Sequence, residues 1–427
     1  AMARGGIYDQ LGGGFHRYAV DGRWGIPHFE KMLYDNAQLA RLYLHAWQVT
    51  GNAFFQTIAQ EVLDYVAREM TASQGGFYSS QDADSEGEEG KFFLWRPEEI
   101  RAVLGEEAGR FMAAYGVSEA GNFEGKNILT LVGTWEERAA LAAARKRMLA
   151  ARARRVPPGR DEKVLASWNG LMLAAFAEAA RVLKRPDYQQ VAEDNAAFLL
   201  REMRREDGRL WHAWKDAGSR MQEAGSRRQG AGSRRQEAGS RRQEAGSRRQ
   251  EAGSRMQEAR GKINGYLEDY ACLIEGLLEL YQSTFAPRWY TAAQELAEAM
   301  IAHFRHPQGG FYDTSDDHEA LVLRPRNLQD NAIPSGNGMA AYVLARLAGL
   351  AQEMRYRDIA EEALLPMQPL LAQYPLGFGQ WLLALDYLLA PPREVAIVGD
   401  GEEDTQALVR AAPVSYTHLR AHETPEH

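Results

Sequence analysis

Leu33-Tyr-Asp35-Asn-Ala37 opens an apolar pattern of helical spacing, and it returns 234 positions later as Leu267-Glu-Asp269-Tyr-Ala271. The same offset turns Gln74-Gly-Gly-Phe-Tyr78 into Gln308-Gly-Gly-Phe-Tyr312. These matches indicate an internal repeat made of a helix opened by Asp or Asn, a return helix and a glycine turn. Such a unit cannot bury its apolar face alone, so it must stack on its neighbours, in an open solenoid or a closed ring.

Further copies of the helix start support this repeat. Leu328-Gln-Asp330-Asn-Ala332 is a third copy of the first motif, and an offset of 168 positions maps Ser167-Trp-Asn169-Gly-Leu171 onto Ser335-Gly-Asn337-Gly-Met339. Apolar periodicity predicts helices, in pairs with Gly and Pro between them, at residues 33–50, 54–70, 171–183, 188–203, 267–281, 290–304, 340–350 and 359–371. Strand patterns are sparse, at residues 91–95, 127–132 and 394–398. The predicted class is all-α, with short β excursions in the loops.

The composition excludes several kinds of protein. With 427 residues, 45% of them hydrophobic, the chain can bury a large core. Its one cysteine, Cys272, allows neither an intramolecular disulfide nor a Cys-x-x-Cys redox or zinc pair, which suits a reducing cytoplasm. No apolar stretch approaches the roughly 20 residues that span a bilayer, and the first residues do not resemble a signal peptide. We therefore expect a cytoplasmic protein with no membrane partner.

An arginine-rich insert stands apart from the rest. From Ala217 to Glu258 a heptapeptide runs six times and carries ten Arg and five Glu, so the insert has a net charge of +5 and the other residues −8 − 5 = −13. An acidic body argues against a nucleic-acid partner. A Gly in every unit opposes a helix, and almost no large apolar residue is present. We predict that residues 217–258 form a disordered tandem-repeat insert.

Longer motifs carry a family resemblance. Gly12-Gly-Gly-Phe-His16, Pro27-His-Phe-Glu-Lys31, Lys163-Val-Leu-Ala-Ser-Trp168 and Asp330-Asn-Ala-Ile-Pro334 resemble the thioredoxin-domain-containing spermatogenesis-associated protein family. The resemblance implies an (α/α)6 toroid of the six-hairpin glycosidase type, akin to N-acylglucosamine 2-epimerases. Family members place a thioredoxin-like domain and the opening helices before the point where this chain starts.

The resemblance also divides the chain. It implies that residues 1–399 form a toroid incomplete at its N-terminus, with residues 217–258 inserted in it. Residues 400–427 would be a truncated C-terminal segment, and its last part, residues 414–427, resembles a translated sequencing adapter. The redox activity of a thioredoxin-like domain is not carried over to this chain.

The repeated helix starts are the first candidate site. Asp35, Asp269 and Asp330, with Asn169 and Asn337, stand at or near predicted helix starts, where capping alone explains such residues. The other reading is functional, because inner helices of a toroid start at the same end and bring polar groups to one mouth. Convergent carboxylates, amides and aromatic faces are typical of sugar sites. Carboxylates gathered there would raise one another's pKa.

Two loops supply further candidates. Asp82 and Asp84 lie in the densest acidic loop, which is either a solvated turn or half of a carboxylate pair for glycoside hydrolysis. The loop lacks the full calcium-binding pattern, so no metal site is predicted. His28 precedes the helix at Leu33, and its ordinary pKa suits proton transfer near neutrality. Glu30 and Lys31 crowd the same turn.

The sequence thus leaves three functions open: a carbohydrate-active enzyme, a non-catalytic ligand- or protein-binding module that partners a thioredoxin-like domain, and a bare scaffold. The enzyme would be a hydrolase with paired carboxylates or a sugar epimerase with histidine bases, with a small sugar ligand and no cofactor. His28, Asp35, Asp82, Asp84, Asp269 and Asp330 are the catalytic candidates, expected in one cavity. The substrate-binding candidates are Glu30, Lys31, Asn36, Trp168, Asn169, Asn331, Asn337 and Tyr312.

Overall fold

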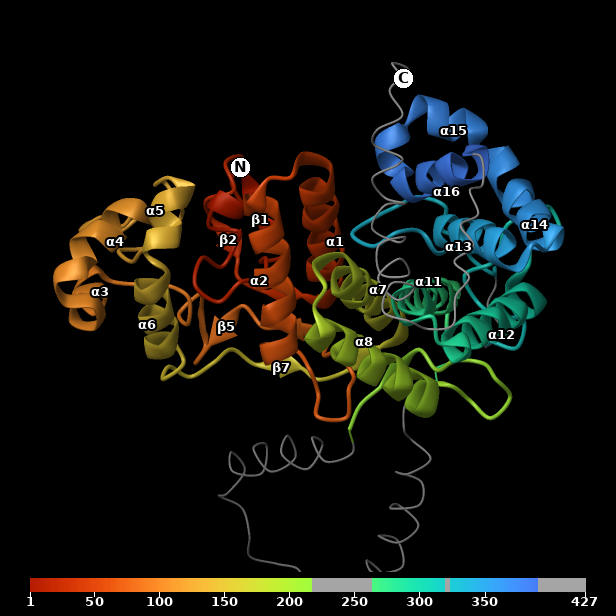
Figure 1. Cartoon of the computed structure of the whole chain (residues 1–427), viewed down its shortest axis with the longest axis horizontal. Coiled ribbons are helices and arrows are strands. Elements are labelled where there is room, and N and C mark those ends of the chain that lie inside the picture. Colours follow the sequence, from red (N-terminus) through yellow and green to blue (C-terminus); the bar gives the residue numbers. More distant parts are fainter. Residues whose placement is uncertain (217–262, 319–322, 391–427) are drawn as a thin grey trace, which may run out of the picture.

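The computed structural model describes residues 1–216, 263–318 and 323–390 (Figure 1). The predicted insert at residues 217–258, the strand at residues 394–398 and the C-terminal segment at residues 400–427 lie outside these residues. Inner helices form an arc: α1 (Leu33–Thr50), α7 (Ala166–Leu183), α11 (Leu267–Thr284), α13 (Gly336–Ala351) and α16 (Gly379–Leu389). Outer helices pack against the first four: α2 (Ala53–Glu69), α8 (Pro186–Phe198), α12 (Pro287–Phe304) and α14 (Met354–Leu364). The described part is thus an (α/α) toroid of successive hairpins, and the all-α prediction is confirmed.

The remaining elements are short. The helices are η1 (Met2–Arg4), α3 (Pro97–Leu104), η2 (Gly105–Glu107), α4 (Ala108–Ala114), α5 (Trp135–Ala140), α6 (Ala142–Arg152), a π-helix η3 (Leu199–Met203), η4 (Leu365–Met367), α15 (Gln368–Gln373) and η5 (Pro375–Gly377). The strands have two residues each: β1 (Tyr18–Ala19), β2 (Pro27–His28), β3 (Lys31–Met32), β4 (Ser80–Gln81), β5 (Asp84–Ser85), β6 (Glu88–Glu89), β7 (Arg160–Asp161), β8 (Val164–Leu165) and β9 (Ala213–Trp214). They pair antiparallel as β1–β2, β3–β4–β7, β5–β6 and β8–β9, and several lead directly into inner helices.

Glycines let the two central inner helices touch. A Cβ at Gly170 of α7 would lie 2.4 Å from the backbone carbon of Cys272 on α11, and a Cβ at Gly276 would lie 2.7 Å from the Gly170 carbonyl oxygen. Neither distance is allowed, so only glycine fits at these positions. The close approach explains why α7 and α11 share the most extensive helix–helix interface among the described residues.

An asparagine staple repeats along the arc. The Oδ1 atoms of Asn36, Asn169 and Asn337 accept the backbone N–H of Phe15 (2.7 Å), Phe77 (2.8 Å) and Phe311 (2.8 Å), respectively. Each of these phenylalanines ends a Gly-Gly-Phe turn, and all three asparagines are at most 1% exposed. The staple thereby ties a turn that precedes an inner helix to that inner helix.

The first glycine of each turn is required by its surroundings. Gly13, Gly75 and Gly309 have φ angles of 77°, 105° and 87°, in the left-handed region that favours glycine. A Cβ there would lie 2.3–2.7 Å from the carbonyl oxygen of Glu61, Asp194 or Glu362, on outer helices α2, α8 and α14. The turn therefore fits between the inner and outer helices of one hairpin.

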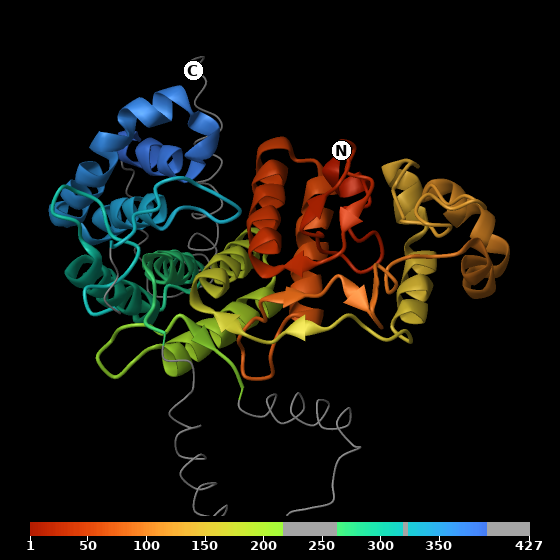
Figure 2. The same cartoon turned by 180° about the vertical axis from the view of Figure 1, so that it is seen from behind.

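A helical insertion was not predicted from the sequence. Helices α3 to α6 form a separate lobe beside α2, with its own core around Trp95, Ile100, Phe111 and Met148 (Figures 1 and 2). The strands predicted at residues 91–95 and 127–132 are wrong: only Trp95 and Asn127 pair, in one isolated bridge. The apolar residues of those segments fill the cores of the lobe and of the adjoining loop instead.

The predicted helix pairs are confirmed with small shifts at their ends. The pattern at residues 33–50 matches α1, and the patterns at residues 267–281 and 290–304 match α11 and α12, which extend a few residues further. The prediction that a helix starts at residues 328–332, the third copy of the motif, is wrong. These residues lie in an irregular loop, and α13 begins only at Gly336.

Candidate functional site

A cavity of about 530 Å³ lies where the inner helices begin. Tyr34, Trp168, Glu268 and Gly336 belong to the first turns of α1, α7, α11 and α13, and all four line it. The complete lining is Arg17, Tyr34, Trp168, Tyr266, Leu267, Glu268, Asp313, Asn327, Asn331, Ala332, Ile333, Pro334, Ser335 and Gly336. The repeated helix starts thus meet at one polar mouth, which we call the mouth cavity.

Aromatic rings form part of its wall. Tyr34 and Trp168 pack edge to face, with ring centroids 4.7 Å apart and planes at 72°. Tyr266 lines the cavity beside the start of α11, and its ring packs against that of His212 at 4.9 Å. Aromatic rings in the wall of a polar cavity suit the apolar faces of a sugar.

Two carboxyl groups of the lining have raised pKa values. Burial raises the pKa of Glu268 to about 7, and the charges of Asp269 and Asp313 add to this, while His212 opposes it. Burial also raises the pKa of Asp313, although the backbone N–H of Asn327 donates to its Oδ2 at 2.8 Å. A carboxylic acid that stays protonated near neutrality can donate a proton.

Asp35 lies beside this cavity, next to Tyr34 in the first turn of α1. Burial raises its pKa to about 7, the charge of Glu30 raises it further, and Arg17 lowers it. Among the described residues, its buried Oδ2 atom has no hydrogen-bond partner. Arg17 lines the cavity and forms an ion pair with Glu30 at 3.0 Å, so its charge is shared between two carboxylates.

The other two helix-start aspartates are used as caps. Asp269 is fully buried, and its carboxylate accepts the backbone N–H groups of Ser167 (2.9 Å) and Tyr266 (2.8 Å) and contacts His212 Nδ1 at 2.9 Å. Asp330 accepts the N–H groups of Ser335 (2.9 Å) and Gln380 (2.8 Å), and the latter lies in the first turn of α16. Neither carboxylate lines the mouth cavity.

The remaining catalytic candidates lie elsewhere, so the six do not share one cavity. His28 is on β2, where its Nδ1 contacts Glu89 at 2.7 Å and its ring stacks on Tyr18. Asp82 and Asp84 are exposed at the β5–β6 hairpin. Hairpin β5–β6 contacts segments that flank the helices of the lobe: Ser85 Oγ donates to the Val156 carbonyl at 2.6 Å, and Glu88 forms an ion pair with Lys126.

The substrate-binding candidates divide in the same way. Trp168 and Asn331 line the mouth cavity, and Glu30 stands behind Arg17. The asparagines Asn36, Asn169 and Asn337 are buried staples, as described above. Tyr312 packs against His306 and Arg324 outside the lining.

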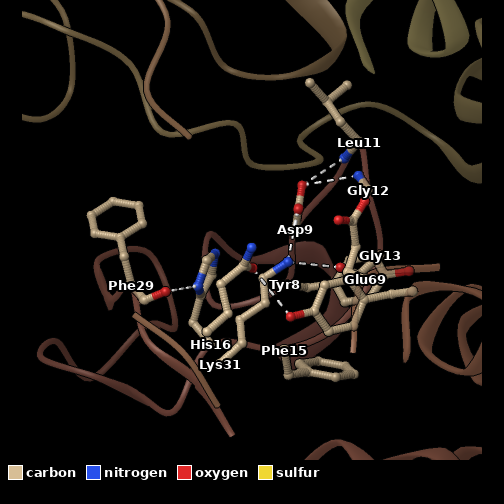
Figure 3. Close-up of polar contacts among 12 residues, drawn as sticks. Tyr8, Asp9, Leu11, Gly12, Gly13, Phe15, His16, Phe29, Lys31 and Glu69 are labelled. Carbon is tan, nitrogen blue, oxygen red and sulfur yellow. Dashed lines mark hydrogen bonds and ion pairs between the residues drawn. The ribbon is translucent and has the colours of Figure 1, made fainter. Parts of the chain in front are cut away.

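Lys31 belongs to a separate buried cluster (Figure 3). Its Nζ donates to Asp9 Oδ2 at 2.8 Å and to the Gly13 carbonyl at 2.9 Å, and Asp9 also binds Arg152 through both carboxylate oxygens. Burial lowers the pKa of Lys31 to about 8 and that of neighbouring His16 to about 3. With 1% of its side chain exposed, Lys31 fastens β3 to the N-terminal loop and α6 and does not reach the mouth cavity.

A second group of charges joins the inner helices to one another. Arg41 of α1 contacts Glu178 of α7 at 2.8 Å and Glu275 of α11 at 2.7 Å. Glu279 of α11 contacts Arg181 at 2.9 Å and Arg346 of α13 at 2.8 Å. His45 adds a contact to Glu178 at 2.6 Å. We call this set the interhelical ion network.

The sequence did not predict four residues of the cavity lining: Glu268, Asp313, Arg17 and Tyr266. A usable signal was present for Glu268, because the offset of 234 positions aligns it with Tyr34, and both line the mouth. In both of these copies, the residue before the aspartate lines the cavity. For metals, no group of three His, Cys, Asp or Glu side chains that could hold an ion occurs within residues 1–216, 263–318 and 323–390.

Fold and site together define an all-α toroid with a polar mouth at the starts of its inner helices. In sequence, the chain is homologous to spermatogenesis-associated protein 20 of Rattus norvegicus and of Homo sapiens, each 32% identical over 97% of this chain and 54% of the relative. The resemblance read from the motifs is thereby confirmed, and the chain spans about half the length of these curated relatives.

No protein-family model matches the chain. Among solved structures, it is similar to a sugar epimerase from a ruminal bacterium, with a TM-score of 0.44 and 9% identity over 85% of this chain and 82% of the other. A cellobiose 2-epimerase from Spirochaeta thermophila gives a TM-score of 0.43 and 11% identity over 85% and 80%. In the described residues, no helix has the length and apolar character to cross a bilayer.

Proposed function

We propose that the mouth cavity binds a small carbohydrate and performs acid–base chemistry on it, with Glu268 and Asp35 as the proton-transferring groups. One observation carries the proposal: a single concavity brings together aromatic faces, amides and the carboxyl groups of Glu268 and Asp313, both with raised pKa values, that of Glu268 to about 7. Asp35, whose pKa is also raised to about 7, lies beside it next to Tyr34. Perturbed carboxyl groups in a cleft are typical of sites that transfer protons.

Each lining group has a role in this proposal. Tyr34, Trp168 and Tyr266 would pack against sugar ring faces, and Asn331 and Arg17 would bind hydroxyl groups. Glu268 would act as the general acid, because burial keeps it partly protonated near neutrality. Asp35, beside the cavity, would be the second titrating group, because its buried Oδ2 has no hydrogen-bond partner among the described residues. The other carboxylates named from the sequence are already hydrogen-bonded, as Asp269 and Asp330 are, or exposed near β5, as Asp82 and Asp84 are.

Two reactions of a carbohydrate are compatible with acid–base chemistry at this cavity. Hydrolysis of a glycosidic bond requires two carboxyl groups across the scissile bond, and epimerisation or isomerisation requires a base and an acid beside an acidic C–H. The alternative function, a non-catalytic binding module, would use the same aromatic and amide groups without turnover.

The test begins with sugar binding. The full chain is screened by thermal shift against mono- and disaccharides, and any hit is incubated and followed by proton NMR for new anomeric signals. We expect binding to be kept and turnover to fall by about 100-fold or more in Glu268→Gln, in the range of general acid catalysis. Glu206→Gln, at an exposed position in the loop after η3, is the matched control. Binding without turnover in the native chain would favour the binding module, and no binding of any sugar would refute the proposal.

A further inference from the structure

The loop before α13 covers the mouth cavity. Residues 327–335, which we call the cover loop, supply Asn327, Asn331, Ala332, Ile333, Pro334 and Ser335 to the lining. The loop extends from the α13–α16 side of the arc toward α1 in both views (Figures 1 and 2). It therefore forms one wall of the cavity from a part of the chain with no regular secondary structure.

The base of the cover loop is firmly held. Asp330 accepts the N–H groups of Gln380 (2.8 Å) and Ser335 (2.9 Å), and its own N–H donates to the Gly377 carbonyl at 2.9 Å. Trp381 Nε1 donates to the Leu328 carbonyl at 2.7 Å. These bonds hold residues 328 and 330 against η5 and α16, and the loop ends at Ser335, the N-cap residue of α13.

The tip, residues 331–334, is held far more lightly. Asn331 and Ala332 are exposed, and the hydrogen bonds of Asn331 stay within the tip itself. Across the described residues, the hydrogen bond that joins the tip to another element comes from Gln38 of α1, whose Nε2 donates to the Ala332 carbonyl at 2.8 Å. The same Nε2 also donates to the backbone carbonyl of Tyr34, one turn earlier in α1, at 3.1 Å.

From these contacts, we propose that residues 331–334 form a movable cover on the mouth cavity, latched to α1 by Gln38, and that ligands enter when the latch opens. The base is held by several hydrogen bonds, whereas the tip has one exposed hydrogen bond to another element and the contact of the partly buried Ile333 with the core. The tip should therefore open at a lower free energy than the base. The latch stands on this geometry alone, whereas its role in ligand entry rests on the proposed function.

Hydrogen exchange tests the latch without any ligand. In Gln38→Ala, we expect exchange of the amides of residues 331–333 to rise roughly 5-fold, because an ordinary hydrogen bond shifts an opening equilibrium by about that factor. The amides of α16 at the base should keep their rates. Gln56→Ala, on outer helix α2 with no contact to the loop, is the matched control. Equal exchange at the tip in Gln38→Ala and the native chain would overturn the latch.

Cross-linking tests the cover. In the double variant Gln38→Cys/Ala332→Cys, a short bismaleimide would tie the tip to α1, and the native Cys272 is buried and does not compete. We expect a disaccharide that binds the native chain to associate at least 10-fold more slowly with the cross-linked form. With the unreacted variant, which lacks the Gln38 latch, it should associate at least as fast as with the native chain. Unchanged association after cross-linking would overturn the cover. If no sugar binds any form, the proposed function fails, and the exchange experiment still decides the latch.

Discussion

The mouth cavity and the interhelical ion network are built on the same four helices, yet their carboxylates behave in opposite ways. In the network, Glu279 lies within 3 Å of two arginines, and Arg41 serves Glu178 and Glu275 together. In the mouth, Glu268 has no cationic partner at salt-bridge distance among the described residues. The network carboxylates are the more deeply buried, with Glu178 and Glu279 at most 5% exposed, whereas Glu268 and Asp35 are partly buried. The difference in their behaviour therefore follows their charged partners.

The pKa values follow the partners. Burial alone would raise the pKa of every buried carboxyl group, but the charges of Arg346 and Arg181 overcome it at Glu279, and Arg41 and His45 overcome it at Glu178, so that both pKa values are lowered. At Glu268 and Asp35 burial prevails, and the pKa rises to about 7. Paired charges stabilise the arc, while unpaired acids are available for chemistry.

Removing one charge from the network should give the largest effect. Glu279→Gln leaves Arg181 and Arg346 buried without their shared carboxylate, and we expect the free energy of unfolding to fall by about 3–5 kcal/mol. Urea denaturation followed by circular dichroism measures this. A loss below about 1 kcal/mol would mean that the network does not hold the helices together.

The same change in the mouth should act in the opposite direction. Because the pKa of Glu268 is raised above its unfolded value of about 4.3, the folded state binds more protons between pH 4.3 and 7, and stability falls as pH rises through that window. Glu268→Gln should therefore stabilise the chain by about 1–2 kcal/mol at pH 8, allowing for partial solvent exposure, and by nothing at pH 4. Thermal unfolding at both pH values checks the sign, and a destabilised variant at pH 8 would contradict it.

Asp35→Asn should show the same pH dependence. Its pKa is also raised to about 7, a value that already includes the lowering by Arg17, and solvent screening reduces the gain because the side chain is only partly buried. We expect a gain of about 1 kcal/mol at pH 8 that disappears at pH 4. Combined with Glu268→Gln, the two gains should add, because distinct sites without a shared partner are independent. Strong non-additivity would show that the two carboxyl groups titrate as a coupled pair.

The smallest effect is expected at the rim of the network. His45 contacts Glu178, but 45% of its side chain is exposed, and Arg41 remains to compensate Glu178. His45→Gln should change stability by less than about 1 kcal/mol. A loss of stability as large as that of Glu279→Gln would mean that solvent exposure does not decide how much each ion pair of the network contributes to stability.

The repeat predicted most of the ring and only part of the site. Residues 33–50 were found as a helix because apolar periodicity and a repeated start coincide there. Helices α3 to α6 were missed because each is only 6 to 11 residues long and has no second copy in the chain.

The predicted site residues were wrong where an aspartate at a helix start caps the helix instead of lining the cavity. Asp269 and Asp330 cap helices, as aspartates at helix starts commonly do, whereas the neighbouring Glu268 faces the mouth. The distinction depends on which side of the helix faces the cavity. That orientation is set by packing across the arc, and a motif of five residues does not contain it.

The asparagine staples bear on how the chain is assembled during synthesis. Each staple joins a turn already made to the inner helix that follows it, over 21 residues for Phe15–Asn36, 26 for Phe311–Asn337 and 92 for Phe77–Asn169, where the helical lobe intervenes. A growing chain can therefore fasten these three hairpins as their inner helices leave the ribosome, before the rest of the chain is made. The long interval at Phe77 marks the one stapling step at which the nascent ring must stay open while another lobe is made.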